Sequence, residues 1–185
     1  MKKIFIISAP SGTGKTTIIL KLKERMKDIC VPITYTTKNP RPEETDGKDY
    51  HFVSRDTFSQ MIKSNKFLEW AEVYNNFYGT PKDEVLKGIQ ENKKIVLTID
   101  TQGGLSIKKI FPETVLIGLL PPSLLEQEKR IRKRNGLNEK EIRQRMVSAR
   151  EERKTLMTKY DFRLINVNIE RTLKKIVNII TKGKK

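Results

Sequence analysis

The chain has 185 residues and a formal net charge of +16, with 38 lysines and arginines against 22 aspartates and glutamates. This length suits one α/β domain with a small insertion and excludes two full-sized domains. One cysteine excludes an intrachain disulfide, and one cysteine with one histidine cannot form a zinc site. The positive charge suits anionic partners such as nucleotides or nucleic acids, but it also fits plainly solvated lysine-rich faces.

A membrane-spanning helix is not expected, because no segment reaches the roughly 18 consecutive apolar residues that a span needs. The chain runs from Met1 directly into an apolar strand pattern, without the features of a cleavable secretory signal. We therefore expect a cytoplasmic protein that does not associate with membranes.

Residues 4–17, IFIISAPSGTGKTT, have the pattern of a strand, a glycine-bearing loop and the start of a helix. Residues 4–7 are apolar and rich in β-branched side chains, as in a strand buried on both faces of a parallel sheet. Gly12 and Gly14 let successive backbone N–H groups point at one anion. The P-loop pattern has a glycine where Ala9 stands, and the rest of the pattern is present.

This loop predicts a site for nucleotide phosphates. Lys15 would reach the β- and γ-phosphates, and the Thr16 hydroxyl would hold Mg²⁺ at the positive end of the next helix. The residues expected to bind ATP here are Ala9, Pro10, Ser11, Gly12, Thr13, Gly14, Lys15, Thr16 and Thr17. Residues 15–27 then predict a helix with one apolar face.

A β-rich insert is predicted next. Residues 29–37 are β-prone, 38–48 are rich in turn formers, and 49–53 alternate as a strand does. A short helix over 56–65 with Asp56 as its cap and a strand-like segment over 67–74 follow. Another helix is expected to start with Thr80 as N-cap and Pro81 at its first position, and to end near residue 92.

The remaining elements alternate between strands and helices. Core strands are expected over 95–99, 115–120 and 162–167, with Asp100 at the end of the first of them, where ligands collect in open α/β sheets. Helices are expected from Ser123 to about residue 134, from 139 to 158 after the cap Asn138, and across the apolar face of residues 169–180.

This order predicts a P-loop type α/β fold, a doubly wound parallel sheet with two excursions. The core would comprise residues 1–33, 81–123 and 159–185, and the excursions would be the insert 34–80 and a helical hairpin 124–158. The hairpin is rich in arginine and could close over anions.

The sequence resembles the guanylate kinase family from residue 4 to about residue 180. Residues 36–53, TTKNPRPEETDGKDYHFV, are similar to the family signature T-[ST]-R-x-x-[RK]-x-x-[DE]-x-x-G-x-x-Y-x-[FY]. The signature positions that match are Arg41, Glu44, Gly47, Tyr50 and Phe52. Residues 67–80, Asp100 with Gln102-Gly103, residues 121–123 and residues 160–166 also match.

The resemblance implies that the insert binds GMP, the P-loop binds ATP and the hairpin is a lid. The resemblance implies that Glu69 and Asp100 face guanine, with Thr34 and Thr80 nearby. It also implies that the acceptor phosphate is bound by Lys38, Arg41, Tyr50 and Tyr78. The full implied GMP set is Thr34, Lys38, Arg41, Glu44, Tyr50, Glu69, Tyr78, Gly79, Thr80 and Asp100. Asn166 would contact the adenine side of ATP.

Three positions depart from the family pattern. The family has arginine where Lys38 stands, and lysine lacks the planar fork that binds two phosphate oxygens. Many relatives carry an acidic residue in place of Thr98, and a polar or acidic residue is common in place of Val167.

The implied reaction is in-line transfer of the γ-phosphoryl group of MgATP to GMP or dGMP, without a protein base. The residues expected to carry it are Lys15, Arg41, Arg130, Arg134 and Arg145. Arg130 and Arg134 lie four apart and share a helix face. Arg132, Lys133, Arg143 and Arg153 are interpreted instead as a solvated face.

Three other interpretations stay open. The first is a catalytically silent guanylate-kinase-like module that binds phosphorylated or acidic protein partners. The second is a nucleic-acid-binding protein, which the aromatic pattern does not favour because the aromatic residues follow core patterns. The third is another P-loop nucleotide kinase with a different acceptor. We expect the small-molecule substrates ATP and GMP and no nucleic-acid partner.

Overall fold

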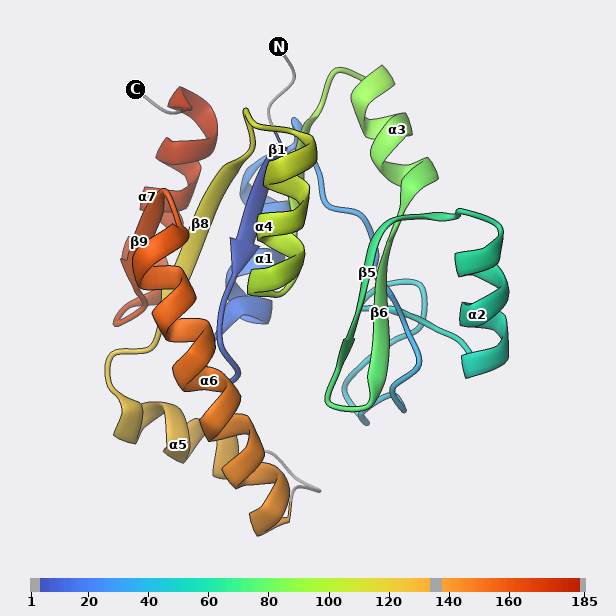
Figure 1. Ribbon diagram of the computed structural model, residues 1–185. Helices are drawn as coiled ribbons and strands as arrows, with labels where there is room; N and C mark the ends of the chain where they lie inside the picture. The colour runs from blue at the N-terminus through green and yellow to red at the C-terminus, as the bar shows by residue number, and fades with distance from the viewer. Residues whose placement is uncertain (1–3, 134–137, 184–185) are drawn as a thin grey trace. The chain divides into compact units, whose positions relative to one another are not determined.

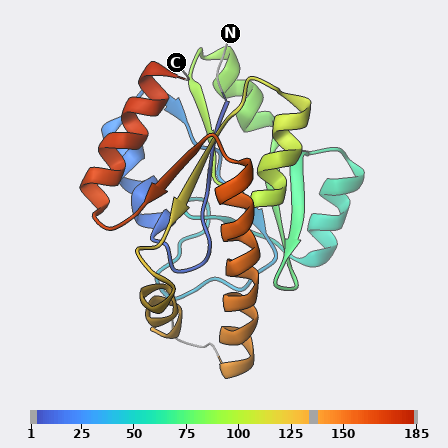
Figure 2. The ribbon, with the colours of Figure 1, turned by 60° about the vertical axis from the view of Figure 1, so that its left-hand side comes forward.

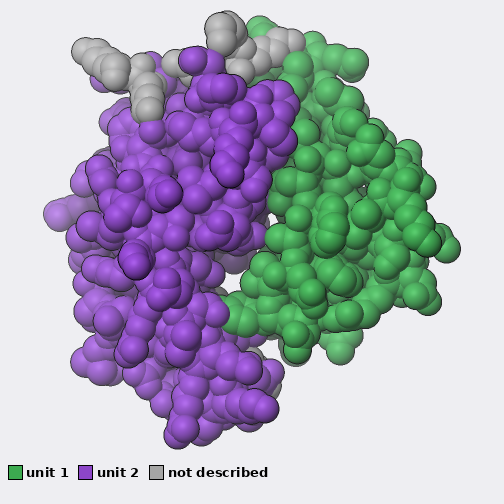
Figure 3. Space-filling model, in the orientation of Figure 1, with its two compact units in different colours: residues 1–2, 28–97 green, residues 3–27, 98–185 purple. Residues whose placement is uncertain are grey.

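The computed structural model describes residues 4–133 and 138–183 (Figure 1). Among these residues, 28–97 form a first compact unit, and 4–27, 98–133 and 138–183 form a second (Figure 3). In the described part of the chain, no helix is both long and apolar enough to cross a membrane.

The second unit is built on parallel strands. They are β1 (Ile4–Ser8), β8 (Val115–Leu120) and β9 (Phe162–Ile165), and β8 pairs with both of the others. Every residue of β1 and β8 is buried. This burial on both faces explains why their sequences are continuous apolar runs rather than alternating ones, and it confirms the two strands predicted there.

Helices cover both faces of these strands. They are α1 (Lys15–Arg25), α4 (Thr101–Ile110), α5 (Leu124–Arg132), α6 (Glu139–Lys159) and α7 (Ile169–Lys182). Helices α1 and α7 contact each other on one face, while α4 and α6 contact each other and β8 on the opposite face (Figures 1 and 2). This is the doubly wound arrangement that the alternating sequence predicts.

Two expectations for this unit were wrong. Strand β9 is not a core strand, because its residues alternate between half-buried and exposed and Ile165 is 58% exposed. Helix α4 was not predicted, since Gly103 and Gly104 lower helix propensity by about 1 kcal/mol each. Both glycines are buried together with Ile107, so tertiary packing outweighs the local preference.

The first unit contains a parallel strand pair and a separate sheet. Strands β2 (Ile29–Cys30) and β7 (Lys94–Leu97) pair in parallel. The other sheet has the order β4-β3-β6-β5, made from His51–Phe52, Tyr35–Thr36, Asn76–Pro81 and Phe67–Val73. Helices α2 (Arg55–Lys63) and α3 (Lys82–Gln90) complete the unit. The predicted β-rich character of this region is confirmed.

Strands β5 and β6 form a hairpin whose second strand was not predicted. Val73 and Asn76 are paired, and the two residues between them, Tyr74 and Asn75, have φ of 51° and 60°. Two positive-φ residues are the geometry of a type I′ turn, which suits the twist of the paired strands. The hairpin brings Glu69 opposite Thr80.

The predicted caps of α2 and α3 were also wrong. Ser54, not Asp56, is the N-cap of α2, and its side chain accepts a hydrogen bond from the Thr57 N–H. Thr80 is not a cap, because β6 continues through Pro81 and α3 begins at Lys82. The sheet pairing places Thr80 in a strand, where its hydroxyl donates to Glu69 instead of capping a helix.

Candidate functional site

The loop between β1 and α1 has the conformation of an anion site. Gly12 and Gly14 have φ of 81° and 92°, in the left-handed region that suits glycine. Gly14 is the N-cap of α1 and cannot provide a side-chain cap, and the first turn of α1 contains no acidic residue. The first N–H groups of α1 and its positive dipole end are therefore available to a phosphate.

Other helices of the second unit begin differently. Asp100 caps α4, with its Oδ1 accepting hydrogen bonds from the N–H groups of Gln102 (2.7 Å) and Gly103 (3.0 Å). Ser123 caps α5 by accepting from the Glu126 N–H. Helix α1 therefore lacks a side-chain cap because the glycine loop precedes it, whereas α4 and α5 in the same unit are capped.

Lys15 lies in a cluster with two carboxylates. Burial lowers the pKa of the Lys15 ammonium, while the charges of Glu152 and Asp100 oppose that change. Burial raises the pKa of Glu152 to about 7, against the attraction of Lys15. The structure therefore brings together Lys15, at the head of α1, Asp100, before α4, and Glu152, on α6, in one partly desolvated group.

Glu152 was not among the predicted site residues. It lies in a helix with charged residues on most of its surface, and nothing in the spacing separates it from the exposed Glu151 beside it. Only the packing of α6 in the second unit distinguishes them. Asp100, which the resemblance assigned to GMP, lies in this cluster rather than in the first unit, which holds the other predicted GMP residues.

The end of β1 is fixed by a buried chain of hydrogen bonds. Tyr160 donates its hydroxyl to Ser8 Oγ at 2.7 Å, and Ser8 Oγ donates to the Ile99 carbonyl at 2.8 Å. Burial raises the pKa of Tyr160, so its proton stays in place across the physiological range. These contacts hold the strand end from which the glycine loop starts.

Asn166 contacts the loop from the end of β9. Its Nδ2 donates to the Thr13 carbonyl at 2.8 Å, and a Cβ on Gly14 would lie only 3.0 Å from that nitrogen. Asn166 Oδ1 and Thr13 Oγ1 are buried and lack a hydrogen-bond partner within the described part of the chain. Asn166 therefore supports the loop conformation, and its contact with ATP stays a prediction.

The predicted lid arginines are placed in part. On α5, Arg130 Nε donates to Glu126 Oε1 at 2.8 Å, and Arg145 lies half-buried on α6. Arg134 lies outside the described residues. Arg132 pairs with Glu128 and with Glu139.

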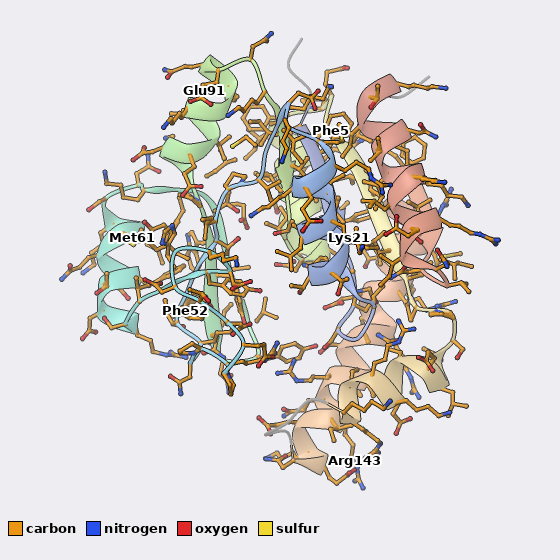
Figure 4. The ribbon with its side chains drawn as sticks, turned by 180° about the vertical axis from the view of Figure 1, so that it is seen from behind. Phe5, Lys21, Phe52, Met61, Glu91 and Arg143 are labelled. Atoms are coloured by element: carbon orange, nitrogen blue, oxygen red, sulfur yellow. The ribbon has the colours of Figure 1, made fainter. Side chains whose placement is uncertain are left out.

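Arg143 is exposed near the start of α6, at the end remote from the strands of its unit (Figure 4). The exposure of Arg143 and the ion pairs of Arg132 fit the solvated-face interpretation of these two residues.

Glu44 is the centre of a second cluster, in the first unit. Lys38 Nζ donates to Glu44 Oε2, and the Arg41 backbone N–H donates to the same oxygen at 2.9 Å. The side chains of Lys38 and Glu44 are only 12% and 11% exposed. Burial lowers the pKa of Lys38, while its hydrogen bond and ion pair with Glu44 oppose the change.

Two tyrosines complete this cluster. Lys38 Nζ lies 4.7 Å from the centroid of the Tyr50 ring, within the range of a cation–π contact. The Tyr50 and Tyr78 rings meet edge to face, with centroids 6.1 Å apart. The structure thus brings together the four side chains predicted to grip the acceptor phosphate, namely Lys38, Arg41, Tyr50 and Tyr78.

Glu69 and Thr80, to which the resemblance assigns base recognition, are in contact in the first unit, and their role stays a prediction. They lie opposite each other on β5 and β6, and Thr80 Oγ1 donates to Glu69 Oε1. Thr80 is 2% exposed. Gly79 is buried beside the Phe67 ring, and Thr34 is half-buried with its carbonyl bonded to the His51 N–H.

A divalent cation would find few protein ligands here. Among the described residues there is no group of three or more His, Cys, Asp or Glu side chains that could hold a metal ion. Thr16 is exposed in the first turn of α1 and offers a hard hydroxyl oxygen. This fits Mg²⁺, which is commonly held by one or two protein oxygens together with substrate phosphates and water.

Comparison with known proteins gives one family. The family model described as guanylate kinase matches residues 1–183. The chain is 47% identical to a guanylate kinase of Caldanaerobacter subterraneus over 96% of this chain and 85% of that protein. It is 42% identical to one of Prochlorococcus marinus over 97% of both chains.

A crystal structure of guanylate kinase from Anaplasma phagocytophilum superimposes with a TM-score of 0.82 at 31% identity, covering 98% of this chain and 85% of the other. The fold class predicted from the sequence is therefore confirmed.

Proposed function

This chain belongs to the guanylate kinase family of nucleoside monophosphate kinases, and we propose that it transfers the γ-phosphoryl group of ATP to GMP and dGMP, giving ADP with GDP or dGDP. The observation that carries this proposal is the presence of both halves of such a site in one chain. The second unit has a phosphate loop with Lys15 at an uncapped helix start, and the first unit has a carboxylate paired with a hydroxyl, Glu69 with Thr80.

Glu69 would select guanine through its Watson–Crick edge. Guanine presents N1–H and N2–H donors there, whereas adenine presents an acceptor at N1. The hydrogen bond from Thr80 orients the Glu69 carboxylate as an acceptor. A carboxylate so oriented accepts two parallel hydrogen bonds from guanine and repels the adenine ring nitrogen.

The cluster around Glu44 would hold the 5′-phosphate of the acceptor. Lys38 and Arg41 supply positive charge, and the Tyr50 and Tyr78 hydroxyls supply donors. Glu44 partly neutralises the two cations and fixes their positions. Because Lys38 is a point charge without the planar fork of arginine, this grip would depend more on Arg41 and the tyrosines.

No protein base is needed for the transfer. The second pKa of a phosphate monoester is about 6, so the attacking oxygen of GMP is largely ionised near neutral pH. The barrier lies in bringing two polyanions together, which positioning and positive charge overcome. Lys15 would neutralise the β- and γ-phosphate oxygens, and Arg41, Arg130, Arg134 and Arg145 would stabilise charge on the transferring group.

Mg²⁺ would accompany ATP, with the Thr16 hydroxyl as its protein ligand. When bound, the ion neutralises oxygens of the β- and γ-phosphates. Thr16 provides a ligand at the helix start without adding negative charge, so the site stays attractive to phosphate.

Residues 124–158 would act as a lid that keeps water from the transferring group, and residues 34–80 would act as the GMP-binding insert of the core. A cytoplasmic location also stays a proposal from the sequence.

The test is ADP formation from MgATP with GMP, dGMP, AMP, UMP or dTMP offered separately. We expect turnover with GMP and dGMP, its loss in Lys15→Ala, and near-normal turnover in Lys21→Ala. Lys21 is a matched control because it lies on the same helix, is 42% exposed and pairs with Glu170 instead. Absence of turnover with every acceptor, in folded protein that binds acidic or phosphorylated peptides, would contradict the proposal and favour a silent binding module.

A further inference from the structure

Gln127 connects α5 to the phosphate loop and has no assigned part in the site. Its side chain is 1% exposed, although it lies in a helix whose neighbouring positions carry charged residues. Its Nε2 donates to the Ser11 carbonyl at 2.8 Å. A buried amide that donates across 116 residues of sequence to one loop carbonyl is a specific contact, because burying an amide without a hydrogen-bond partner is unfavourable.

Holding this carbonyl also orients an N–H group. In a trans peptide the carbonyl of one residue and the N–H of the next point in opposite directions. With the Ser11 carbonyl directed at Gln127, the Gly12 N–H points to the other side of the loop. Asn166 does the same at the Thr13 carbonyl, which directs the Gly14 N–H away from Asn166.

Two buried amides, from α5 and from the end of β9, therefore hold alternate carbonyls of the loop. Together they direct the N–H groups of Gly12 and Gly14 away from the two amides, and an anion-binding loop needs several N–H groups available to the ligand.

The backbone of α5 rests directly on the loop at the same point. A Cβ built on Gly12 would lie 3.0 Å from the Gln127 carbonyl oxygen and 3.1 Å from Ile131 Cγ1. A side chain at position 12 would therefore have no room beside α5, and the loop can lie this close to the helix because residue 12 is glycine. Arg130 follows Gln127 by three positions, on a neighbouring part of the helix surface, so the anchor of α5 also limits where this arginine can lie.

We propose that Gln127 is a positioning residue, which fixes the phosphate loop in its anion-binding conformation and anchors the first lid helix to it. The inference rests on the proposed ATP site and assigns to it a residue that does not touch the nucleotide. Its effect is on the free energy of binding phosphate, since a loop that is already ordered loses less conformational freedom when ATP binds.

Two substitutions separate the hydrogen bond from the packing. Gln127→Met keeps the length of the side chain and removes the donor. Gln127→Glu keeps the shape and places an acceptor opposite the Ser11 carbonyl, so the two groups repel. Gln144→Met is the matched control, because Gln144 is exposed on α6 in the same predicted lid.

The dissociation constants of MgATP and of GMP are measured for each variant by calorimetric titration, with denaturant unfolding alongside. We expect the MgATP dissociation constant to rise about tenfold in Gln127→Met, the effect of one unpaired acceptor, and further in Gln127→Glu. GMP affinity should stay within about twofold, and Gln144→Met should match the unmodified protein.

Unchanged MgATP affinity in folded Gln127→Met protein would overturn the inference, even with reduced stability, because Gln127 would then only pack. Equal losses of MgATP and GMP affinity would overturn it too, since they would reflect general disruption. If the unmodified protein neither bound MgATP nor phosphorylated GMP, the proposed function itself would fail instead.

Discussion

Glu152→Gln is expected to stabilise the protein, and to do so more as the pH rises. Burial raises the pKa of this carboxyl from its ordinary value of 4.5 to about 7. Below pH 4.5 the carboxyl is protonated in both the folded and the unfolded chain, so an amide in its place changes little. Above that pH the unfolded chain loses the proton first, and the folded protein is progressively destabilised until its own carboxyl ionises near pH 7.

The size of the effect follows from the two pKa values. The interval from 4.5 to about 7, at about 1.36 kcal/mol per pKa unit, corresponds to a maximum of ~3 kcal/mol. Because Glu152 keeps some contact with solvent, we expect a measured gain of about 1–3 kcal/mol at pH 8 and a gain near zero at pH 4.5. The Glu152 pKa of about 7 already includes the attraction of Lys15, which acts to lower it.

The assay is urea unfolding of the unmodified protein and the variant at pH 4.5, 6 and 8, without nucleotide. Glu151→Gln serves as the control, because Glu151 is the adjacent exposed residue on α6 and should show no such pH-dependent gain. A stability difference for Glu152→Gln that is the same at all three pH values, or that grows toward low pH, would refute the reasoning that this carboxyl is desolvated beside Lys15.

Three further predictions concern the site. Glu69→Gln should raise the KM for GMP by about tenfold or more with little change in the KM for ATP, because the amide turns a donor toward guanine; equal KM values for GMP in steady-state assays would contradict this. Gly12→Ala should lower the free energy of unfolding by about 1–2 kcal/mol in denaturant titrations, given its φ of 81° and its closeness to α5, whereas Gly47→Ala, with φ of 72° but open space around it, should show only the backbone strain. Lys38→Arg should lower the KM for GMP several-fold, since a guanidinium binds two phosphate oxygens; a higher KM would show that the tight pairing with Glu44 leaves no room for the larger group.

The elements with long apolar runs were predictable because their signal is local. Strands β1 and β8 are buried on both faces, so each of their residues is selected for burial and the sequence shows a continuous run. The phosphate loop was also predictable from the sequence. Its backbone has positive φ at Gly12 and Gly14, and this local requirement for glycine does not depend on the rest of the fold. The sequence also offered roles for the acceptor-site residues, through its resemblance to a family pattern, and these roles stay predictions.

Two of the failures arose because packing or strand pairing outweighed the local sequence preference. Helix α4 forms despite two glycines because its buried face packs in the second unit, and Thr80 lies in a strand because it pairs with Glu69 across a hairpin. A propensity of a few tenths of a kcal/mol to about 1 kcal/mol per residue cannot compete with such packing. Strand β9 differs, because its sequence predicted a core strand but its residues alternate between half-buried and exposed.

The sequence by itself determined that this chain binds nucleotide phosphates and belongs with the guanylate kinases, because the loop and the signature are short-range patterns. Only the tertiary structure decided which of many similar side chains serve that site. Glu152 differs from Glu151, and Gln127 from Gln144, in nothing that composition or spacing records. Glu152 is half-buried and interacts electrostatically with Lys15, and Gln127 is buried and bonded to the Ser11 carbonyl. Both partners are more than a hundred positions away in the sequence, so only the tertiary structure gives these two side chains their surroundings.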